Sequence, residues 1–326
     1  MTHHIRVLSQ EEVRLTLTMH EAIDVMSDAF SQLSNGMLMM PVRMVADFDE
    51  ATLFYKPAAS KNERVIGVKL LTQVGSNRER SLPAIQGIIL LTDYVDGRFL
   101  ALMDGTYITA LRTGAAAGLA TKWLSREEAK VAAIFGAGAQ GRMQLSALSV
   151  VRNIEKVYVF DLDKNVVDAC ISEMQPQCRA KLLPGTSTQV LKEVDIICTA
   201  TNATKPLFEM SNLKRGVHIN AIGSFKPYMN EISEEVVAHA LVYVDHNESA
   251  LAESGDLINP IRSGAITQSH IVGEIGALIN GNIPGRIHED QTTLFKSVGV
   301  AVQDLAAANA VYRKAIINNL GQIIHL

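Results

Sequence analysis

The feature that most constrains the fold is a glycine-rich junction near the middle of the chain. An apolar run over 131–135 leads directly into Gly136, Gly138 and Gly141, and a helical pattern follows over 142–151. At such a junction the first glycine permits a tight turn, the second lets the backbone approach a pyrophosphate, and the third lets helix and strand pack closely. The helix N-terminus then offers free N–H groups to the phosphates. The sequence therefore predicts a Rossmann unit that binds a dinucleotide.

The residues of this junction are the predicted contacts to the dinucleotide phosphates: Gly136, Gly138, Ala139, Gln140 and Gly141. The next strand-like run, 157–160, ends at Asp161. A carboxylate at this place can bind the ribose hydroxyls and repels the 2′-phosphate of NADP. We therefore expect NAD(H) to be favoured, with NADP(H) as the other possibility.

Thr199 and Thr201 follow another buried strand-like run and are further candidates to line the cofactor. A strand-end turn held by bonds from the two hydroxyls to the backbone explains them equally well. The sequence leaves these two interpretations open.

Two different patterns of apolar residues divide the chain into two domains. In the second half, strand-like runs alternate with helix-length intervals, which predicts a parallel, helix-covered α/β sheet. These runs are 131–135, 157–160, 195–199, 217–222 and 241–245. In the first half, short apolar runs divided by turn signals predict an antiparallel sheet with hairpins. These runs are 53–55, 65–71, 85–91 and 99–103.

Three further segments have helical patterns. Residues 20–34 predict an amphipathic helix, and the alanine-rich segment 109–123 predicts a helix that leaves the first sheet. Residues 294–320 have one long helical pattern, which we expect to pack against the N-terminal sheet.

Bulk composition excludes several classes of protein. A chain of 326 residues is long enough for two domains of about 150 residues each. The net charge is -4 without a basic block, so we expect no nucleic-acid partner. No apolar run reaches the length of a membrane span, and no signal core follows Met1. Three cysteines without a C-x-x-C pair suit a reducing compartment, so we expect a cytoplasmic protein; no metal motif is present.

Three cations stand at unusual positions. Lys69 interrupts the apolar run 65–71, where a buried ammonium needs an anion. Arg112 lies near the start of the predicted helix 109–123, where a cation opposes the helix dipole unless an anion is shared. Arg43 precedes the sheet. Spacing alone does not bring the three together, and each could be a surface charge.

Several segments resemble the ornithine cyclodeaminase/mu-crystallin family, in family order along nearly the whole chain. They are Pro41-Val-Arg43, Gly67-Val-Lys69, Pro83-Ala-Ile-Gln-Gly87, Arg112-Thr-Gly-Ala-Ala-Ala117, Gly136-Ala-Gly-Ala-Gln-Gly141, Ser254-Gly-Asp-Leu257 and Thr293-Leu-Phe-Lys-Ser-Val-Gly299. The Arg112 segment together with the Thr293 segment is the most specific part of this resemblance.

The resemblance implies a Rossmann domain inserted into a discontinuous α+β domain for substrate binding and dimerisation. We place the latter at 1–118, completed by 301–326, and the Rossmann domain at 119–300. The resemblance also implies a homodimer, with Arg43, Lys69 and Arg112 around the substrate carboxylate and Thr113 near the cofactor. Lys69 and Arg112 are the predicted catalytic residues.

One departure from the family narrows the predicted activity. In the cyclodeaminase branch, an aspartate that handles the substrate amines follows the segment that matches Asn220-Ala-Ile-Gly223, and Phe225 stands there in this chain. We therefore expect an NAD(P)H-dependent reductase of a cyclic imino acid, such as Δ1-pyrroline- or piperideine-2-carboxylate, that yields the cyclic L-amino acid. The alternatives are an alanine-type amino acid dehydrogenase, an ornithine cyclodeaminase, and a mu-crystallin-like protein that binds NADPH and a small ligand.

Overall fold

The computed structural model describes residues 4–41, 43–80 and 82–325, and it is a mixed α/β structure as predicted. The chain forms two compact units. Unit 1 comprises Met1–Arg112 with Val300–Leu326, and unit 2 comprises Thr113–Gly299. The first boundary lies at 112/113 instead of the expected 118/119, and both positions fall within helix α3 (Gly105–Leu124). The second lies at 299/300 instead of 300/301.

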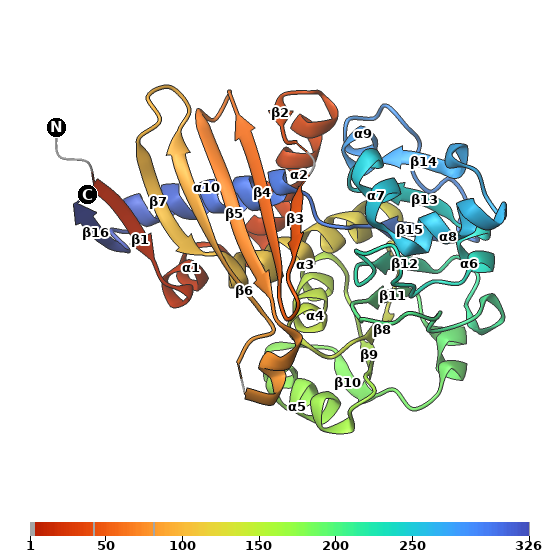
Figure 1. Cartoon of the computed structure of the whole chain (residues 1–326). Coiled ribbons are helices and arrows are strands. Elements are labelled where there is room, and N and C mark those ends of the chain that lie inside the picture. Colours follow the sequence, from red (N-terminus) through yellow and green to blue (C-terminus); the bar gives the residue numbers. More distant parts are fainter. Residues whose placement is uncertain (1–3, 42, 81, 326) are drawn as a thin grey trace. The chain divides into compact units, whose positions relative to one another are not determined.

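Unit 1 is built on one sheet with the strand order β16-β1-β7-β6-β5-β4-β2, and β3 pairs with β4 (Figure 1). The strands are β1 (His4–Leu8), β2 (Leu38–Met39), β3 (Met44–Asp47), β4 (Thr52–Ser60), β5 (Val65–Gln73), β6 (Ile85–Asp93), β7 (Phe99–Asp104) and β16 (Gln322–His325). The predicted antiparallel meander is confirmed in β4 to β7. The parallel pairing of β1 with β7 was not predicted.

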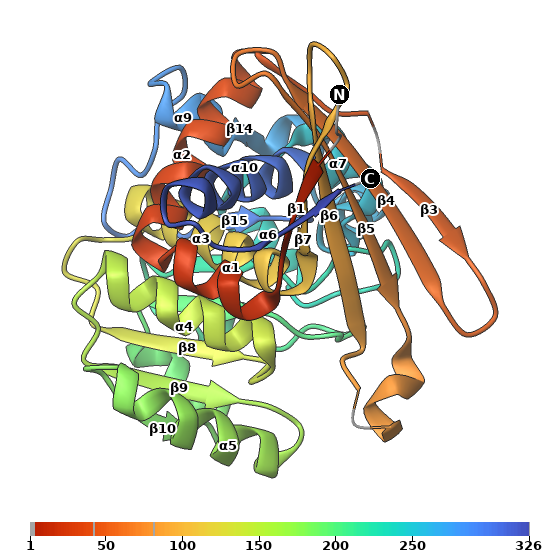
Figure 2. The same ribbon diagram turned by 90° about the vertical axis from the view of Figure 1, so that its left-hand side faces the viewer.

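Helices cover one face of this sheet. They are α1 (Gln10–Thr16), α2 (Met19–Ser34) and α10 (Ala301–Ile317). Figures 1 and 2 both place α10 against the sheet, where it contacts β4, β5 and β6. The helix packs closely on β5 at Gly67, where a Cβ would lie only 2.7 Å from Leu305 Cδ1. The expected packing of the C-terminal helix on the N-terminal sheet is confirmed.

Unit 2 contains a sheet in which all strand pairs are parallel, in the order β10-β9-β8-β11-β12-β15-β13-β14. The strands are β8 (Val131–Phe135), β9 (Lys156–Phe160), β10 (Lys181–Pro184), β11 (Ile196–Thr199), β12 (His218–Ala221), β13 (Leu241–Val244), β14 (Ile271–Glu274) and β15 (Thr293–Lys296). Ala133 and Phe135 of β8 join one apolar core, and Ala132 and Ile134 join another. Successive side chains point to opposite faces, so this sheet is buried on both sides, as the Rossmann prediction requires.

The remaining elements of unit 2 are helices. They are α4 (Ala139–Val151), α5 (Lys164–Met174), α6 (Glu234–His239), α7 (Asn247–Glu253), α8 (Gly255–Ser263) and α9 (Ile275–Ile279). Short 3₁₀ helices cover Gly75–Arg80 in unit 1 and Gln175–Gln177, Thr188–Glu193, Met210–Asn212 and Gln268–His270 in unit 2. Among the described helices, none is both long and apolar enough to cross a membrane.

The single helix predicted over 294–320 is wrong. Its first residues form β15, which lies inside the sheet between β12 and β13. Gly299 has a φ of +78°, a left-handed conformation that ends this segment, and α10 begins at Ala301. A buried strand and a buried helix both read as continuous apolar sequence, so the pattern could not separate them.

The turn expected after the apolar run 99–103 is not a hairpin. Strand β7 ends at Asp104 and α3 begins at the next residue, while Asp104 Oδ1 accepts a bond from the backbone N–H of Tyr107 at 2.7 Å. The helix therefore starts one turn before the predicted Thr109. Arg112 lies in the helix interior, so the dipole argument for an anion beside it does not apply.

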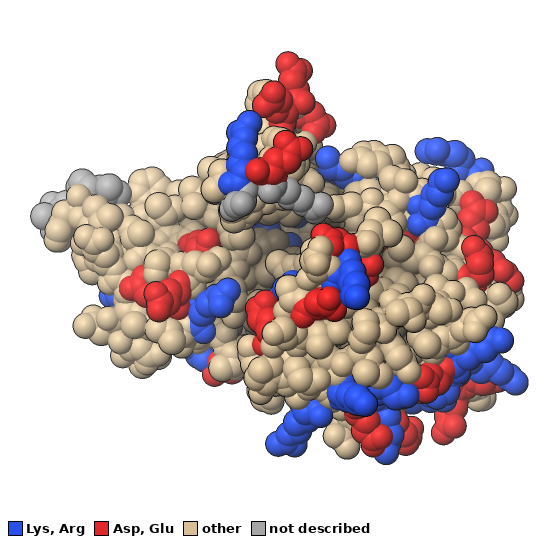
Figure 3. All heavy atoms as spheres, turned by 90° about the horizontal axis from the view of Figure 1, so that it is seen from below, with Lys and Arg blue, Asp and Glu red and all other residues tan. Residues whose placement is uncertain are grey.

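On the face drawn in Figure 3, acidic and basic side chains of the described residues are interspersed. They do not gather into one broad field of a single sign on that face.

Candidate substrate and cofactor sites

Unit 1 contains a buried cluster of charges on three of its elements. Lys69 comes from β5, Arg112 from α3 and Asp304 from the first turn of α10. Lys69 Nζ lies 2.7 Å and Arg112 Nε 3.0 Å from the same oxygen, Asp304 Oδ1. The three residues are at most 4% exposed. The structure therefore brings together two of the predicted substrate-binding cations, and it supplies the anion that their burial requires.

Polar neighbours fix the two cations. Lys69 Nζ donates to Thr109 Oγ1 at 3.1 Å, and Thr109 in turn donates to the carbonyl of Gly105 at 2.6 Å. Arg112 Nη1 donates to Gln303 Oε1 at 2.8 Å. Each cation is thus held by Asp304 and by one further side chain.

Two more cations act on this cluster. The guanidinium of Arg43 lies 5.2 Å from the ring centre of Phe54 on β4. Lys56, also on β4, stands directly opposite Lys69 in the register of β4 and β5, and both side chains are buried. Like charges directly opposite each other on one face of a sheet repel. Lys56 therefore places a second buried lysine beside Lys69, at a position that the sequence interpretation overlooked.

Burial and mutual repulsion shift the titration of the lysines. Burial lowers the pKa of Lys69 to about 8, with Asp304 opposing the shift and Arg112 and Arg43 adding to it. Burial also lowers the pKa of Lys56 well below its ordinary value, and Lys69 and Arg43 lower it further.

Asp304 responds in the opposite sense. Burial by itself would raise the pKa of this carboxyl, but Arg112, Lys69 and Lys56 together hold it below its usual range. Asp304 is therefore ionised at neutral pH, and the cluster still has more positive than negative charge.

Two buried polar atoms of the cluster are available to a ligand. Within the described part of the chain, Asp304 Oδ2 accepts no hydrogen bond and Gln303 Nε2 donates none. An acceptor and a donor beside an excess of cations suit a small molecule with both an N–H group and a carboxylate.

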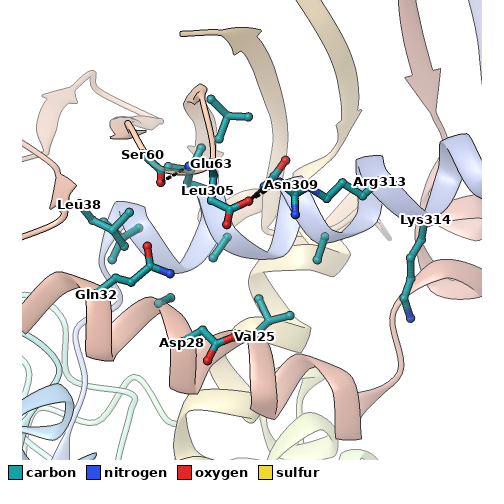
Figure 4. A pocket seen from close by; sticks show the side chains of 15 residues that line it. Val25, Asp28, Gln32, Leu38, Ser60, Glu63, Leu305, Asn309, Arg313 and Lys314 are labelled. Carbon is teal, nitrogen blue, oxygen red and sulfur yellow. Dashed lines mark hydrogen bonds and ion pairs between the residues drawn. The ribbon is translucent and has the colours of Figure 1, made fainter. Parts of the chain in front are cut away.

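A separate pocket of unit 1, of about 300 Å³, lies between α2 and α10. In Figure 4, Glu63 pairs with Arg313 and accepts from Asn309 Nδ2 at 3.2 Å. Lys69, Arg112 and Asp304 do not line this pocket. The lining of this pocket has two acidic and two basic side chains, so the pocket does not have the excess of positive charge that the cation cluster has.

In unit 2, the glycine-rich junction has the form that a dinucleotide requires. A Cβ on Gly136, whose φ is +94°, would lie 2.5 Å from the carbonyl of Ala200. A Cβ on Gly141 would lie 1.9 Å from the carbonyl of Gly136, whereas one on Gly138 would meet no described atom within 4 Å. The first and third glycines are needed for packing, and the second leaves open space over the N-terminus of α4. These residues fit a pyrophosphate.

Asp161 lies beside this junction, directly after β9. Its Oδ2 accepts from the backbone N–H of Ala137 at 2.9 Å, and its Oδ1 accepts from Asp163 at 3.2 Å. The side chain is exposed. An exposed carboxylate fixed next to the glycines is well placed for a ribose, which keeps the predicted role open.

The strand-end turn is present at Thr201, whose hydroxyl accepts from the backbone N–H of Ala203 at 3.1 Å, and both threonines also have a partner that the sequence did not indicate. Both hydroxyls donate to the buried carboxylate of Glu231, at 2.9 Å and 2.8 Å, and the N–H of Thr201 donates at 2.7 Å. A cofactor contact would have to come from other atoms of these residues. Thr113, the other cofactor candidate, is buried on α3 in unit 2.

Glu231 is part of a buried network that explains two of the quoted segments. Asp256 Oδ1 accepts from the backbone N–H groups of Glu231 and Ile232, at 2.7 and 3.1 Å. Asp256 Oδ2 accepts from Lys296 Nζ at 3.0 Å. Burial raises the pKa of Glu231, and Asp256 raises it further while Lys296 lowers it. The network joins residues far apart in sequence, so spacing could not reveal it.

Two residues of the unit 1 cluster had a readable signal that was missed. Lys56 lies between Phe54 and Ala58 in the row of buried side chains on one face of β4, as Lys69 lies among apolar residues on β5. Asp304 is a buried acid in the first turn of α10, among apolar residues such as Val302 and Leu305. A charged residue on an apolar face calls for a partner, so this rule would have marked each of the two as a candidate without naming its partner.

The chain is similar to known proteins along nearly its whole length. The model of the ornithine cyclodeaminase/mu-crystallin family matches residues 3–319. A Δ1-pyrroline-2-carboxylate reductase of Bacillus cereus is 36% identical over 322 residues, which cover 98% of this chain and 99% of the relative.

Two solved structures are similar over the same length. The Δ1-pyrroline-2-carboxylate reductase of Thermococcus litoralis, in complex with NADH and L-proline, is 35% identical with a TM-score of 0.94, covering 98% of this chain and 99% of that one. A dimeric archaeal alanine dehydrogenase with bound NAD is 31% identical with a TM-score of 0.91 at the same coverage.

Proposed function

The chain belongs to the ornithine cyclodeaminase/mu-crystallin family, and from this premise we propose that it is an NADH-dependent reductase of a cyclic imino acid. Its substrate is Δ1-pyrroline-2-carboxylate or the six-membered piperideine-2-carboxylate, and its product is the cyclic L-amino acid. The observation that carries the proposal is the cluster of Lys69, Arg112 and Asp304, with an excess of cations and an open acceptor. The reductases at 35–36% identity support this activity.

The cofactor site is assigned to the glycine-rich junction. Backbone N–H groups of Ala139 and Gln140, at the N-terminus of α4, would hold the pyrophosphate, and Asp161 would hold the ribose. When bound, NADH supplies the hydride that reduces the C=N bond. The relatives crystallised with NADH or NAD support NAD(H) as the cofactor.

The substrate site is assigned to the cation cluster. Arg112 and Arg43 bind the carboxylate, and Lys69, with a pKa of about 8, remains protonated at neutral pH and adds a third donor. A protonated imine accepts hydride more readily than a neutral one. Asp304 Oδ2 can accept a hydrogen bond from the iminium N–H and so stabilise that form. The nitrogen keeps its proton as the carbon is reduced, which gives the secondary amine.

An amino acid dehydrogenase of the alanine type is the second candidate, because the archaeal alanine dehydrogenase is similar over nearly the whole chain. Such an enzyme makes its imine from a keto acid and ammonia, whereas a cyclic imine needs no ammonia. Oxidation of NADH with Δ1-pyrroline-2-carboxylate in ammonia-free buffer therefore tests the proposal. Activity only with pyruvate and ammonia would favour the alternative.

Ornithine cyclodeamination is tested separately. Phe225 has no acid–base function and offers an ammonium only a cation–π contact of about 0.5–2 kcal/mol. Incubation with NAD and L-ornithine should release negligible proline and ammonia. Robust release of both would contradict the reductase assignment.

We also propose a homodimer formed by the second face of the unit 1 sheet. The row Pro57, Val68, Leu90 and Leu102 crosses β4, β5, β6 and β7 in register on the face opposite Lys69. Tyr55, Ile66 and Ile88 on this face are 38–44% exposed. A continuous apolar sheet face of this kind is a typical association surface. The dimeric archaeal alanine dehydrogenase supports a dimeric state, and analytical ultracentrifugation tests that state.

A cytoplasmic location is proposed on the three cysteines. Cys170, Cys178 and Cys198 are all free thiols. This state suits a reducing compartment.

A further inference from the structure

Gln303 joins the start of α10 to the proposed substrate site, and none of its surface is exposed. It is the third residue of the helix, and its Oε1 accepts from the backbone N–H of Val300 at 2.8 Å, which caps the helix. The same oxygen accepts from Arg112 Nη1 at 2.8 Å. Gln303 therefore ties the helix end to the arginine that is assigned to the substrate carboxylate.

Two donors on one oxygen determine how the amide of Gln303 is turned. A nitrogen in the place of Oε1 would face N–H groups of both Arg112 and Val300 and could accept from neither. The oxygen is therefore the atom at that place, and Nε2 occupies the other branch of the planar amide. Although Nε2 is buried, it donates to no residue in the described part of the chain.

A buried donor without an acceptor is costly, so one that persists indicates a ligand or a water molecule that completes it. The proposed substrate restricts the choice of acceptor. Its protonated imine nitrogen is a donor and its ring carbons form no such bonds, so the carboxylate oxygens are its acceptors. Together these two oxygens accept about four hydrogen bonds, so they can take a further donor beside Arg43, Lys69 and Arg112.

We propose that Gln303 is a substrate-binding residue whose Nε2 donates to the carboxylate of the cyclic imino acid, next to Arg112. This inference rests on the proposed reductase function and adds to the site a neutral donor that selects a carboxylate. The amide oxygen of Gln303 positions Arg112, and the amide nitrogen binds the ligand. A glutamate would keep the first task and lose the second, because both of its oxygens are acceptors.

The variant Gln303→Glu separates these two tasks. Glutamate keeps the length of the side chain and an acceptor for Arg112 and Val300, but it places a carboxylate oxygen where Nε2 stood. Asn309→Asp is the matched control, because it adds the same charge at a buried position of α10 six residues (309 − 303), or about 9 Å, further along the helix. Both variants and the wild type are assayed for reduction of Δ1-pyrroline-2-carboxylate by NADH, with L-proline and L-prolinamide as inhibitors.

In Gln303→Glu, the inhibition constant of L-proline should rise about ten- to hundred-fold, because two carboxylates face each other where a charge-assisted hydrogen bond stood. L-Prolinamide has N–H groups where L-proline has an oxygen, so its inhibition constant should not rise. Asn309→Asp should keep the ratio of the two inhibition constants within about three-fold of the wild-type ratio. Equal changes for both inhibitors in Gln303→Glu, or the same shift of the ratio in Asn309→Asp, would overturn the role of Nε2.

A measurement on the wild-type protein covers the case in which Gln303→Glu does not fold. A crystal structure with NAD and L-proline should place a carboxylate oxygen of proline within about 3.2 Å of Gln303 Nε2. A proline carboxylate bound out of reach of Nε2 would overturn the proposal and leave the reductase function intact. A wild-type protein that reduces no cyclic imine with NADH would instead contradict the reductase function itself.

Discussion

The two units each bury a cluster of charges, and the clusters differ in whether their hydrogen bonds are complete. In unit 2, every carboxylate oxygen of Glu231 and Asp256 accepts a hydrogen bond. The donors are backbone N–H groups, threonine hydroxyls and the ammonium of Lys296. In unit 1, Asp304 keeps one oxygen without a described donor, beside more cations than it can neutralise. A complete network needs nothing further, whereas an incomplete one of the same burial indicates a ligand.

This difference separates structural charges from functional ones without reference to relatives. The unit 2 network holds together the loops after β11 and β12 and the end of β15. Its removal should reduce stability. The unit 1 cluster should instead control turnover, so the two clusters should respond to mutation in different assays.

The largest effect is expected from breaking the complete network. Lys296→Met removes the lysine that bonds to Asp256 beside the buried carboxylate of Glu231, and loss of one partner of a buried pair typically costs about 3–5 kcal/mol. We expect a loss of this size in the free energy of unfolding, measured by urea denaturation. Lys205→Met, at an exposed site of unit 2, should change the free energy of unfolding little. A loss below about 1 kcal/mol for Lys296→Met would remove the distinction between the clusters.

The incomplete cluster should respond in kinetics. Arg112→Ala and Lys69→Ala each remove a charge-assisted bond to a substrate carboxylate, so kcat/KM should fall about ten- to hundred-fold. The dissociation constant for NADH, measured by fluorescence titration, should stay near the wild-type value because unit 2 holds the dinucleotide. Near-normal turnover in both variants would return these residues to a structural role.

A pH profile sharpens the comparison. The pKa of Lys69 is lowered to about 8, so its positive charge is present below that pH and lost above it. The kcat/KM for the imine should therefore decline as the pH rises through about 8, with a slope approaching ten-fold per unit. Stability has the opposite sign: between about pH 8 and 10.5 the unfolded chain binds more protons at this group, so the Lys69 contribution to unfolding free energy rises with pH.

The variant Lys69→Arg separates this titration from that of the imine. Arginine keeps its proton throughout the range, so the alkaline decline assigned to Lys69 should move to higher pH. An unchanged profile in the arginine variant would assign the decline to the substrate.

The sequence could predict what depends on local pattern and not what depends on long-range pairing. The strands from β4 to β9 follow apolar runs bounded by turns, and the glycines at 136, 138 and 141 specify their own geometry. The strand β15 was hidden because its central place in the sheet leaves it buried on both sides and without alternation. Asp304 lies 235 positions after Lys69 (304 − 69), so only the fold could reveal that this acid is the partner.

The smallest effect concerns the choice of cofactor. Asp161 sits beside the glycines with an exposed carboxylate, and the negative charge disfavours the 2′-phosphate of NADPH. Asp161→Ser keeps a hydroxyl acceptor for the bond from Ala137 but removes the charge. The ratio of kcat/KM with NADH to that with NADPH should fall by about ten-fold, one partly exposed charge interaction. Asp163→Ser, two residues away at the N-cap of α5, is the matched control and should leave the ratio nearly constant. A wild-type protein that prefers NADPH, or an Asp161→Ser variant with an unchanged ratio, would assign cofactor choice to other residues.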